Sequence, residues 1–329
     1  MQFKFDRRTV LKAGAALAAS ATLPAWAQAA PTLRFAAVFS DKDIRADMIR
    51  MLIKDVEADA KIEPFYGGTL FKQGTELVAL QRDNLELGNI APQDISKQLP
   101  AWSALTSAYT FRDANHVLAF FKSDVGLQMI RQAEDQLKIK ILGPTFFGTR
   151  QVGLKPKKKI NTPADLAGIK LRMPPGDAWQ LLGRSLGANP TPMAYAETYT
   201  GLQTGAIDGQ DNPLPNVQNM KFYEVMSQIV LTSHLVAFDV LCMNQKSWNA
   251  MAPAKQKTFQ AAVDKALMWS VQEHLKREAE LADGFKKQGL DVYTPDIAAF
   301  RSHAQKVYLA SDEAKSWAPG ILDKIGSVK

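Results

Sequence analysis

The sequence predicts an α/β fold with about two domains. Three observations carry this prediction: a length of 329 residues, apolar segments that alternate between strand and helix periodicity, and one long segment without internal proline. A typical domain of roughly 150 residues gives about two domains for a chain of this length. Because 46% of the residues are hydrophobic, the chain can bury a sizeable core.

The first segments of the alternating pattern predict a β-α-β unit. Residues 32–39 (TLRFAAVF) form an apolar run that is typical of a strand buried on both faces. Residues 44–58 place apolar side chains at helical spacing, and residues 61–65 predict a second strand, so the two strands are expected to be parallel. A third strand is predicted over residues 85–90. Residues 91–94 follow it as a loop, and loops at strand ends of α/β sheets bind ligands.

The middle of the chain continues the alternation of strands and helices. Residues 169–173 alternate apolar and polar side chains and predict a short strand. Pro174–Gly176 ends this strand, because proline donates no hydrogen bond to a neighbouring strand. A helix is then predicted over residues 178–186, with Asp177 as its N-cap.

The remaining elements follow from the same two periodicities. A helix is predicted over residues 196–204, and residues 209–215 are predicted to be an irregular loop. Residues 229–243 form the most apolar run outside the N-terminal segment and predict one or two strands. Residues 253–288 contain no internal proline and no glycine before Gly284, so they predict one very long helix.

The N-terminal segment, residues 1–29, predicts an export signal. Arg7–Arg8 precedes a weakly apolar, alanine-rich stretch over residues 13–23, which is typical of a twin-arginine signal. A general secretory signal whose basic region contains two arginines fits the same residues. Small residues at alternate positions predict cleavage near Ala27 or Ala29, so the mature protein is expected in the periplasm. An uncleaved anchor is not expected, because the apolar run is well short of ~20 residues.

The charge pattern argues against a nucleic-acid site, and the cysteine content excludes an internal disulfide. Four basic residues and one acidic residue among residues 1–29 account for +3 of the net charge of +7, which leaves a mild +4. The basic run over residues 155–159 lacks interleaved aromatic residues, so it predicts a solvated loop and no nucleic-acid site. The single cysteine, Cys242, excludes an internal disulfide, and its apolar neighbours predict a buried, inert thiol.

No catalytic, cofactor or metal motif is recognisable in the sequence. A nucleophile elbow and a His-Glu-x-x-His motif are absent, and the four histidines form no acid–base constellation. His234, in an apolar run, is interpreted as a core histidine. The glycines of residues 67–71 lack the form of a nucleotide site. No catalytic residue, cofactor or metal ion is therefore expected. A secreted α/β enzyme that acts on a small carboxylate is kept as an alternative function.

Arg172 is the most informative single residue. It lies in a short apolar strand just before a double proline, where a side chain is expected to be largely buried. A buried guanidinium needs an acceptor. The acceptor is either an Asp or Glu of the same chain or a ligand carboxylate held by two parallel hydrogen bonds. The residues alone leave both alternatives open.

The segment around Arg172 resembles the signature region of the solute receptors of tripartite ATP-independent periplasmic (TRAP) transporters, a family that includes C4-dicarboxylate receptors. The order and spacing of six motifs match. These motifs are Leu171-Arg172-Met173-Pro174 and residues 187–195 (GANPTPMAY), 197–199 (ETY), 202–205 (LQTG), 208–214 (DGQDNPL) and 221–225 (KFYEV). Weaker similarity extends over nearly the whole mature chain.

The resemblance implies a two-lobed periplasmic binding protein, type II-like, with hinge strands and a long helix that spans both lobes. Lobe I is expected to comprise residues 30–147 and 239–277, and lobe II residues 148–238 and 278–329. The implied function is to bind a small organic acid between the lobes and to deliver it to a TRAP-type permease. The acid is a C4-dicarboxylate, a hydroxy acid or a sugar acid, and a monomer is expected. A stand-alone sensing receptor of the same fold is a further alternative.

Eight residues are expected to bind the ligand: Arg172, Asn212, Arg150, Tyr195, Trp179, Asp177, Gln93 and Phe238. By the resemblance, Arg172 makes a bidentate contact with the ligand carboxylate, and Asn212 forms a hydrogen bond with the same group. Arg150 matches the family's arginine in the segment that first crosses between the lobes. It is expected to contact the ligand or to form a salt bridge at the hinge, and Phe238 is expected to line the cavity.

The other expected contacts surround the carboxylate. Tyr195 matches the aromatic wall of the family's binding cavity, and Trp179 follows Arg172 closely in the sequence. Asp177 either accepts hydrogen bonds from ligand hydroxyls or serves only as an N-cap. Ala91 stands where the family often has an acidic side chain, with Gln93 and Asp94 nearby, so this departure leaves part of the ligand specificity undetermined.

Overall fold

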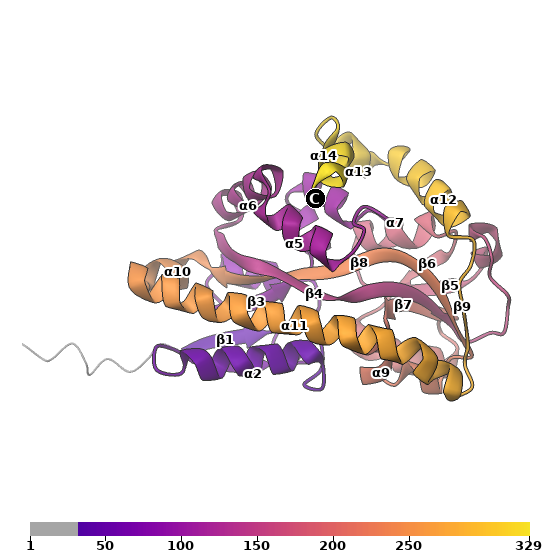
Figure 1. The fold of residues 1–329 in the computed structure, drawn as a ribbon, viewed down its shortest axis with the longest axis horizontal. Coiled ribbons are helices and arrows are strands. Elements are labelled where there is room, and N and C mark those ends of the chain that lie inside the picture. Colours follow the sequence, from indigo (N-terminus) through magenta and orange to yellow (C-terminus); the bar gives the residue numbers. More distant parts are fainter. Residues whose placement is uncertain (1–31) are drawn as a thin grey trace, which may run out of the picture.

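A computed structural model describes residues 32–329, and the predicted export signal lies outside the described residues. The strands form one nine-stranded sheet in the order β2-β1-β3-β8-β4-β7-β5-β6, with β9 beside β8. Helices cover both faces of this sheet (Figure 1). The predicted α/β fold with two lobes, hinge strands and a long helix is confirmed.

The first lobe begins with the predicted β-α-β unit. Strands β1 (Thr32–Ala36) and β2 (Lys61–Phe65) are parallel, and α2 (Ile44–Val56) connects them. β1 ends three residues earlier than predicted, and β3 (Leu87–Ile90) pairs with it in parallel. Helices on the same lobe cover the sheet; they are α3 (Glu76–Gln81), α4 (Pro92–Ser96), α5 (Ala114–Lys122), α6 (Asp124–Leu137), α10 (Gln245–Ala250) and the 3₁₀ segment η1 (Pro100–Thr106).

Two long antiparallel strands run through both lobes. They are β4 (Ile139–Leu154) and β8 (Gln228–Asn244), and Figure 1 shows them side by side along the centre of the molecule. Their pairing shifts between Phe146 and Gly148 and again between Arg150 and Val152. Gly148 adopts a φ of +118°, which a glycine tolerates without strain. These irregular pairs lie where the strands pass from one lobe to the other, so the hinge is built into the sheet itself.

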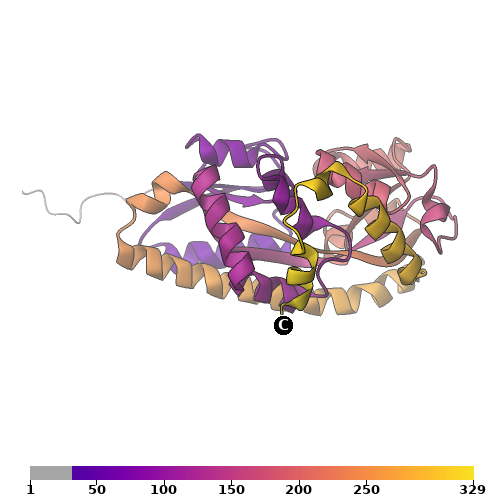
Figure 2. The ribbon, with the colours of Figure 1, turned by 90° about the horizontal axis from the view of Figure 1, so that it is seen from above.

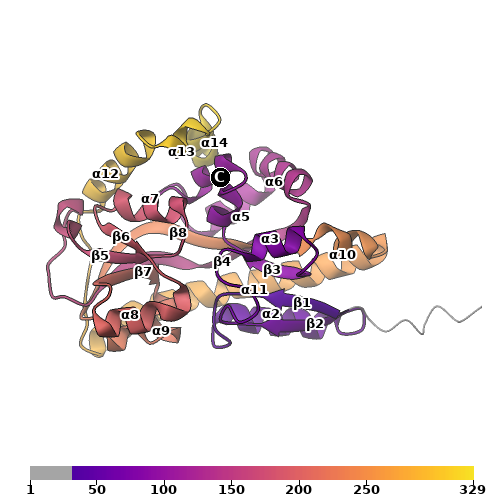
Figure 3. The same ribbon diagram turned by 180° about the vertical axis from the view of Figure 1, so that it is seen from behind.

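The second lobe carries the segment with the six family-like motifs. Its strands are β5 (Lys170–Met173), β6 (Asn189–Pro192), β7 (Gly209–Pro213) and β9 (Asp291–Tyr293). Its helices and 3₁₀ segments are α7 (Asp177–Ser185), α8 (Thr198–Thr204), α9 (Leu214–Asn219), η2 (Pro163–Leu166), η3 (Tyr195–Glu197) and η4 (Phe222–Glu224). In Figure 3 these elements lie on the opposite side of the molecule from β1, β2 and β3.

Two local predictions in this lobe are wrong. Residues 209–215 are not a loop: β7 is buried along its whole length and continues directly into α9. Its polar side chains misled the prediction, because they are buried with partners inside the protein. Asp177 is not the N-cap of α7 but its first residue, because Gly176 occupies the N-cap with a φ of +125°.

The predicted long helix is confirmed as α11 (Pro253–Lys287), a single helix of 35 residues. It packs against α2 and β4 at one end and against α9 and β9 at the other, so it joins both lobes (Figure 2). Along residues 32–329, no helix combines the length and the apolar character needed to cross a membrane. The predicted buried thiol is confirmed, since Cys242 is fully buried in β8.

The chain ends with α12 (Ile297–Leu309), α13 (Asp312–Lys315) and α14 (Ile321–Ser327). Ile325 of α14 packs in one core cluster with Val117 and Phe120 of α5, and its carbonyl lies 2.8 Å from His116 Nε2. The expected lobe II therefore includes a terminal helix that packs on lobe I. The lobe boundaries themselves stay a prediction.

Glu278 of α11 lies where the strands cross between the lobes. The backbone N–H of Thr149 donates a hydrogen bond of 2.5 Å to Glu278 Oε1. A Cβ atom at Gly148 would lie only 2.7 Å from the same oxygen, so the glycine permits the close approach. Burial raises the pKa of the Glu278 carboxyl from 4.5 to about 7.

We expect Glu278→Gln to change how stability depends on pH. An acid whose folded pKa is raised stabilises the fold fully below its unfolded pKa of 4.5, and this stabilisation is lost as pH rises through about 7. The glutamine keeps an acceptor for Thr149 and has no charge to bury. The variant should be more stable than the parent at pH 8, by about 1–2 kcal/mol for a partly exposed group, and equally stable at pH 4. Urea unfolding at both pH values measures this, and a difference independent of pH would contradict it.

Candidate functional site

A cavity of about 540 Å³, including its opening to solvent, lies between the two lobes. Residues of β3, β8 and the segment before α3 line it from lobe I, and residues of β5, β7, α7 and α9 line it from lobe II. The two lobes also touch at the cavity, where the backbone N–H of Tyr195 donates to Gln73 Oε1 at 2.8 Å.

Arg172 projects from β5 into this cavity and is completely buried. Its Nε donates to the carbonyl of Met193 at 2.9 Å, but within residues 32–329 neither Nη1 nor Nη2 has a hydrogen-bond partner. Burial lowers the pKa of the guanidinium to about 10, so it is still protonated at neutral pH. The salt bridge within the chain that the sequence left open is therefore not formed, and two charged donors are available to a ligand.

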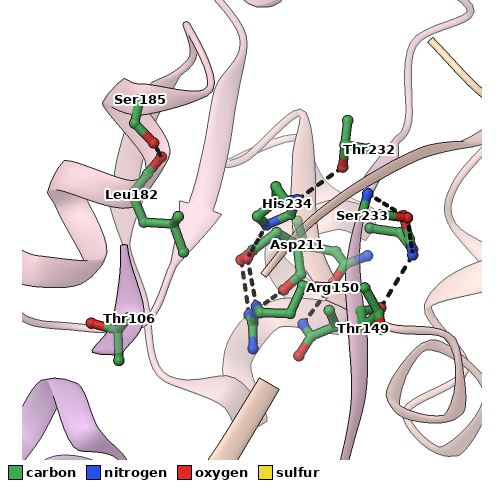
Figure 4. Close-up of polar contacts among 12 residues, drawn as sticks. Thr106, Thr149, Arg150, Leu182, Ser185, Asp211, Thr232, Ser233 and His234 are labelled. Carbon is green, nitrogen blue, oxygen red and sulfur yellow. Dashed lines mark hydrogen bonds and ion pairs between the residues drawn. The ribbon is translucent and has the colours of Figure 1, made fainter. Parts of the chain in front are cut away.

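Arg150 of β4 also lines the cavity, but it is paired within the protein. Its Nε lies 2.6 Å from Asp211 Oδ2 and its Nη2 lies 2.9 Å from Asp211 Oδ1. His234 Nε2 lies 3.1 Å from the same carboxylate, and its Nδ1 lies 2.8 Å from the hydroxyl of Thr232 (Figure 4). The hinge salt bridge expected for Arg150 is present, and His234 is the core histidine that the sequence predicted.

Asp211 determines the charge of this side of the cavity. Burial alone would raise the pKa of its carboxyl, but Arg150 and His234 hold it well below its ordinary value. The charge of Asp211 also acts on Arg172, although its hydrogen bonds go to Arg150 and His234. Two guanidinium groups thus lie in the field of one carboxylate, and the surplus positive charge favours an anion beside Arg172.

The structure brings five of the eight predicted residues to this cavity; they are Arg172, Asn212, Arg150, Tyr195 and Trp179. Arg172 lies over the ring of Tyr195 at 5.8 Å, and Arg150 lies over the ring of Trp179 at 4.9 Å. Asn212 on β7 donates to Gln210 Oε1 at 2.7 Å. The aromatic rings therefore pack against the two cations.

The other three predicted residues lie elsewhere. Gln93 and Phe238 line a smaller cavity of about 200 Å³, which shares Phe147 and Trp179 with the main one. Asp177 is exposed in the first turn of α7 and lines neither cavity. The exposed position of Asp177 follows from Gly176, which takes the N-cap and starts the helix one residue earlier than predicted.

Sequence reasoning missed a buried cation on the lobe I side of the cavity. Arg45 forms two hydrogen bonds of 2.9 Å with the carboxylate of Asp43 and one of 3.2 Å with Asp239 Oδ2. Its guanidinium lies between the rings of Phe39 and Phe147, at 4.3 and 4.2 Å. Arg45 occupies the first turn of an amphipathic helix, where arginines are usually solvated, so its sequence position gave no signal. The loop with Asp43 at the end of β1 was the available indication.

Acidic and amide side chains complete the lobe I side. Asn89 Nδ2 donates to Asp239 Oδ2 at 2.5 Å, and the backbone N–H of Gly74 donates to Glu76 Oε2 at 2.8 Å. Burial raises the pKa of Asp239 to about 6 and that of Glu76 to about 7. Asp94 pairs with Lys97 at 2.6 Å. In the described part of the chain, no group of three or more His, Cys, Asp and Glu side chains is arranged to hold a metal ion.

We expect Asp211→Asn to destabilise the protein strongly. The substitution leaves Arg150 buried without its carboxylate, and breaking a buried ion pair from one side costs about 3–5 kcal/mol. Urea unfolding gives the free-energy difference. Asp283→Asn is the matched control, because this exposed aspartate pairs with Lys286 on the same helix and should change stability by less than ~1 kcal/mol. Similar losses in the two variants would contradict the role of Asp211.

Comparisons with known proteins show similarity to extracellular solute-binding proteins. The profile of the bacterial extracellular solute-binding proteins, family 7 (DctP), matches residues 37–314. The sialic acid-binding periplasmic protein SiaP of Vibrio cholerae is 32% identical over 214 residues, which are 65% of this chain and 66% of that protein. The 2,3-diketo-L-gulonate-binding periplasmic protein YiaO of Escherichia coli is 27% identical over 81% of this chain and 82% of that protein.

A solved structure is similar along nearly the whole chain. It is a TRAP periplasmic solute-binding protein from Roseobacter denitrificans with bound 3-deoxy-D-manno-oct-2-ulosonic acid. The two chains are 39% identical with a TM-score of 0.90, over 92% of this chain and 100% of that one.

Proposed function

Because this chain belongs to the bacterial extracellular solute-binding proteins of family 7, we propose that it binds a small organic acid between its lobes and delivers it to a TRAP-type membrane permease. Proteins of this family bind solutes and are not enzymes, so the alternative of a secreted α/β enzyme is not retained. No feature of the described residues favours the stand-alone sensing receptor.

The observation that carries this proposal is the state of Arg172. Its guanidinium is buried and charged, and both Nη atoms lack partners among the described residues. A carboxylate is the planar acceptor that matches two parallel N–H donors of a guanidinium. The ligands named for SiaP, YiaO and the structure from Roseobacter denitrificans are all acids, which supports the same assignment.

The other residues of the cavity take supporting roles in this proposal. Asn212 forms a hydrogen bond with the same carboxylate, and Tyr195 and Trp179 pack around it. Arg150 is held by Asp211 and adds positive charge next to Arg172. Gln93 and Phe238 shape the adjoining smaller cavity, while the exposed position of Asp177 does not favour its predicted contact with the ligand.

Closure of the lobes would couple ligand binding to recognition by the permease. Arg172 approaches the ligand from lobe II, and the side chains around Asp239 approach it from lobe I. A ligand that contacts both lobes stabilises the closed state relative to the open one. The hydrogen bond from the Tyr195 N–H to Gln73 forms only when the lobes meet, so it adds to the closed state.

The proposal includes the location and the partners of the protein. Residues 1–29 direct export, by the twin-arginine or the general secretory route, and are removed near Ala27 or Ala29, which leaves a monomeric receptor in the periplasm. The permease then moves the acid with a sodium or proton gradient. Periplasmic relatives such as SiaP and YiaO support this location.

We expect Arg172→Ala to weaken binding of the cognate acid by about two to four decades. The substitution leaves a buried carboxylate without its partner, which costs roughly 3–5 kcal/mol. The ligand is identified by thermal melting of the mature protein against an organic-acid library, after unfolding and refolding to remove bound ligand. A ligand at 100 times its dissociation constant adds about 2.7 kcal/mol to stability.

Titration calorimetry then compares the parent, Arg172→Ala and the control Arg184→Ala, whose side chain is exposed on α7. The control should bind as tightly as the parent. An Arg172→Ala variant that folds and binds within a factor of ten of the parent would refute the role of Arg172. Binding of sugars, amines or nucleotides but of no carboxylate would refute the proposed function.

A further inference from the structure

Four side chains of lobe I line the cavity and present mainly hydrogen-bond acceptors to it; they are Glu76, Asn89, Asp94 and Asp239, here called the acceptor face. All four are buried or nearly so. Arg172, in contrast, presents unpaired donors from lobe II. A ligand that spans the cavity therefore meets donors at one end and acceptors at the other.

Asn89 has a buried acceptor oxygen for which the described residues supply no hydrogen-bond donor. Its Nδ2 donates to Asp239 Oδ2 at 2.5 Å. Because an ionised carboxylate only accepts hydrogen bonds, this contact settles which end of the amide is the nitrogen. The other end, Oδ1, is buried and has no partner within residues 32–329. A buried acceptor without a donor is costly, so a donor from the ligand is expected there.

The two aspartates of the acceptor face also have unused acceptor capacity. Both hydrogen bonds that Asp239 receives, from Asn89 and from Arg45, end on Oδ2. The ion pair of Asp94 with Lys97 uses Oδ1. Lys97 balances the charge of Asp94, whereas the single charge of Arg45 is shared between Asp43 and Asp239. The free oxygens can accept hydrogen bonds from ligand hydroxyls, which are neutral donors.

The charges around the cavity also disfavour a second carboxylate on the ligand. Three arginines line the cavity, and in the described part of the chain Arg45 and Arg150 are paired with aspartates. Once a ligand carboxylate binds Arg172, no lining arginine is left without a partner. A second carboxylate would lie against Asp239 and Asp94, where like charges repel.

We propose that the acceptor face binds ligand hydroxyl groups, so that this receptor selects a monocarboxylic acid with several hydroxyls over a dicarboxylate or an unsubstituted acid. The inference rests on the proposed function, since the carboxylate at Arg172 orients the ligand. By this inference, the acceptor face (Glu76, Asn89, Asp94 and Asp239) determines whether the receptor binds a C4-dicarboxylate, a hydroxy acid or a sugar acid. Ala91, which lies beside them in the cavity, contributes no charge to this choice.

A matched set of acids tests the proposal by calorimetry on the mature protein after removal of bound ligand. Gluconate, glucarate and hexanoate each have six carbons. Compared with gluconate, glucarate carries a second carboxylate and hexanoate lacks all hydroxyls. The set also contains 3-deoxy-D-manno-oct-2-ulosonic acid, succinate and glutamine. We expect either gluconate or the ulosonic acid to bind at least about a hundredfold more tightly than glucarate, hexanoate, succinate and glutamine. Each of these four ligands loses two or more hydrogen bonds to charged acceptors or places a charge that opposes them.

The outcomes separate this proposal from the proposed function. Tightest binding of succinate, glucarate or hexanoate, lost in Arg172→Ala, would leave the receptor function intact and overturn the hydroxyl assignment. Tightest binding of glutamine would overturn it in favour of an ammonium site. Failure of every acid in the set to bind would count against both.

Two variants test the acceptor face directly. Glu76→Gln and Asp94→Asn keep the side-chain shape and replace a carboxylate oxygen with an amide donor. At pH 8, above the pKa of about 7 for Glu76, each should weaken binding of the hydroxylated acid about tenfold and reduce its preference over glucarate. Asp283→Asn, exposed on α11, is the matched control and should change neither. Unchanged preference in both variants, with unligated melting temperatures like that of the parent, would overturn the proposal.

Discussion

The structure depends on one interaction that the chain does not complete by itself: the two unpaired donors of the buried Arg172 guanidinium. Burying a cation is costly unless an acceptor is supplied, and the only hydrogen bond that the guanidinium makes to the described residues runs from Nε to the carbonyl of Met193. In the proposed function, a carboxylate that enters between the lobes supplies this acceptor. The proposal therefore links binding to closure, because the ligand would meet Arg172 from lobe II and the side chains of lobe I at the same time.

The surrounding network keeps Arg172 available. Asp211 is the acidic side chain on β7 that might have paired with it, but Asp211 is held by Arg150 and His234. On the other lobe, Asp43 and Asp239 are held by Arg45, whose guanidinium lies between two phenylalanine rings. Among the described residues, the aspartates of the cavity therefore have partners within the chain, which leaves an unpaired cation on lobe II and free hydrogen-bond acceptors on lobe I. Glu278 of α11 approaches β4 closely at Gly148 and Thr149, where the chain passes between the lobes.

The elements were predictable from the sequence where one periodicity dominates. The strand-helix-strand unit of β1, α2 and β2 and the 35-residue α11 follow from apolar spacing and from the positions of proline and glycine. β7 was not predictable in this way, because buried polar side chains with partners look like a loop in the sequence. The Arg172 side of the site was found through a contiguous set of motifs. Arg45, Asn89 and Asp239 were missed, since they come from three distant segments that only the fold brings together.

The most direct test of the central claim is a crystal structure of the mature protein with its acid bound. The carboxylate oxygens should lie about 2.7–2.9 Å from Nη1 and Nη2 of Arg172, as in charge-assisted pairs, with the ligand hydroxyls turned toward Asn89 and Asp239. A ligand whose carboxylate binds another cation, or an Arg172 whose Nη atoms pair with the chain in the complex, would contradict the claim that this guanidinium is the anion site.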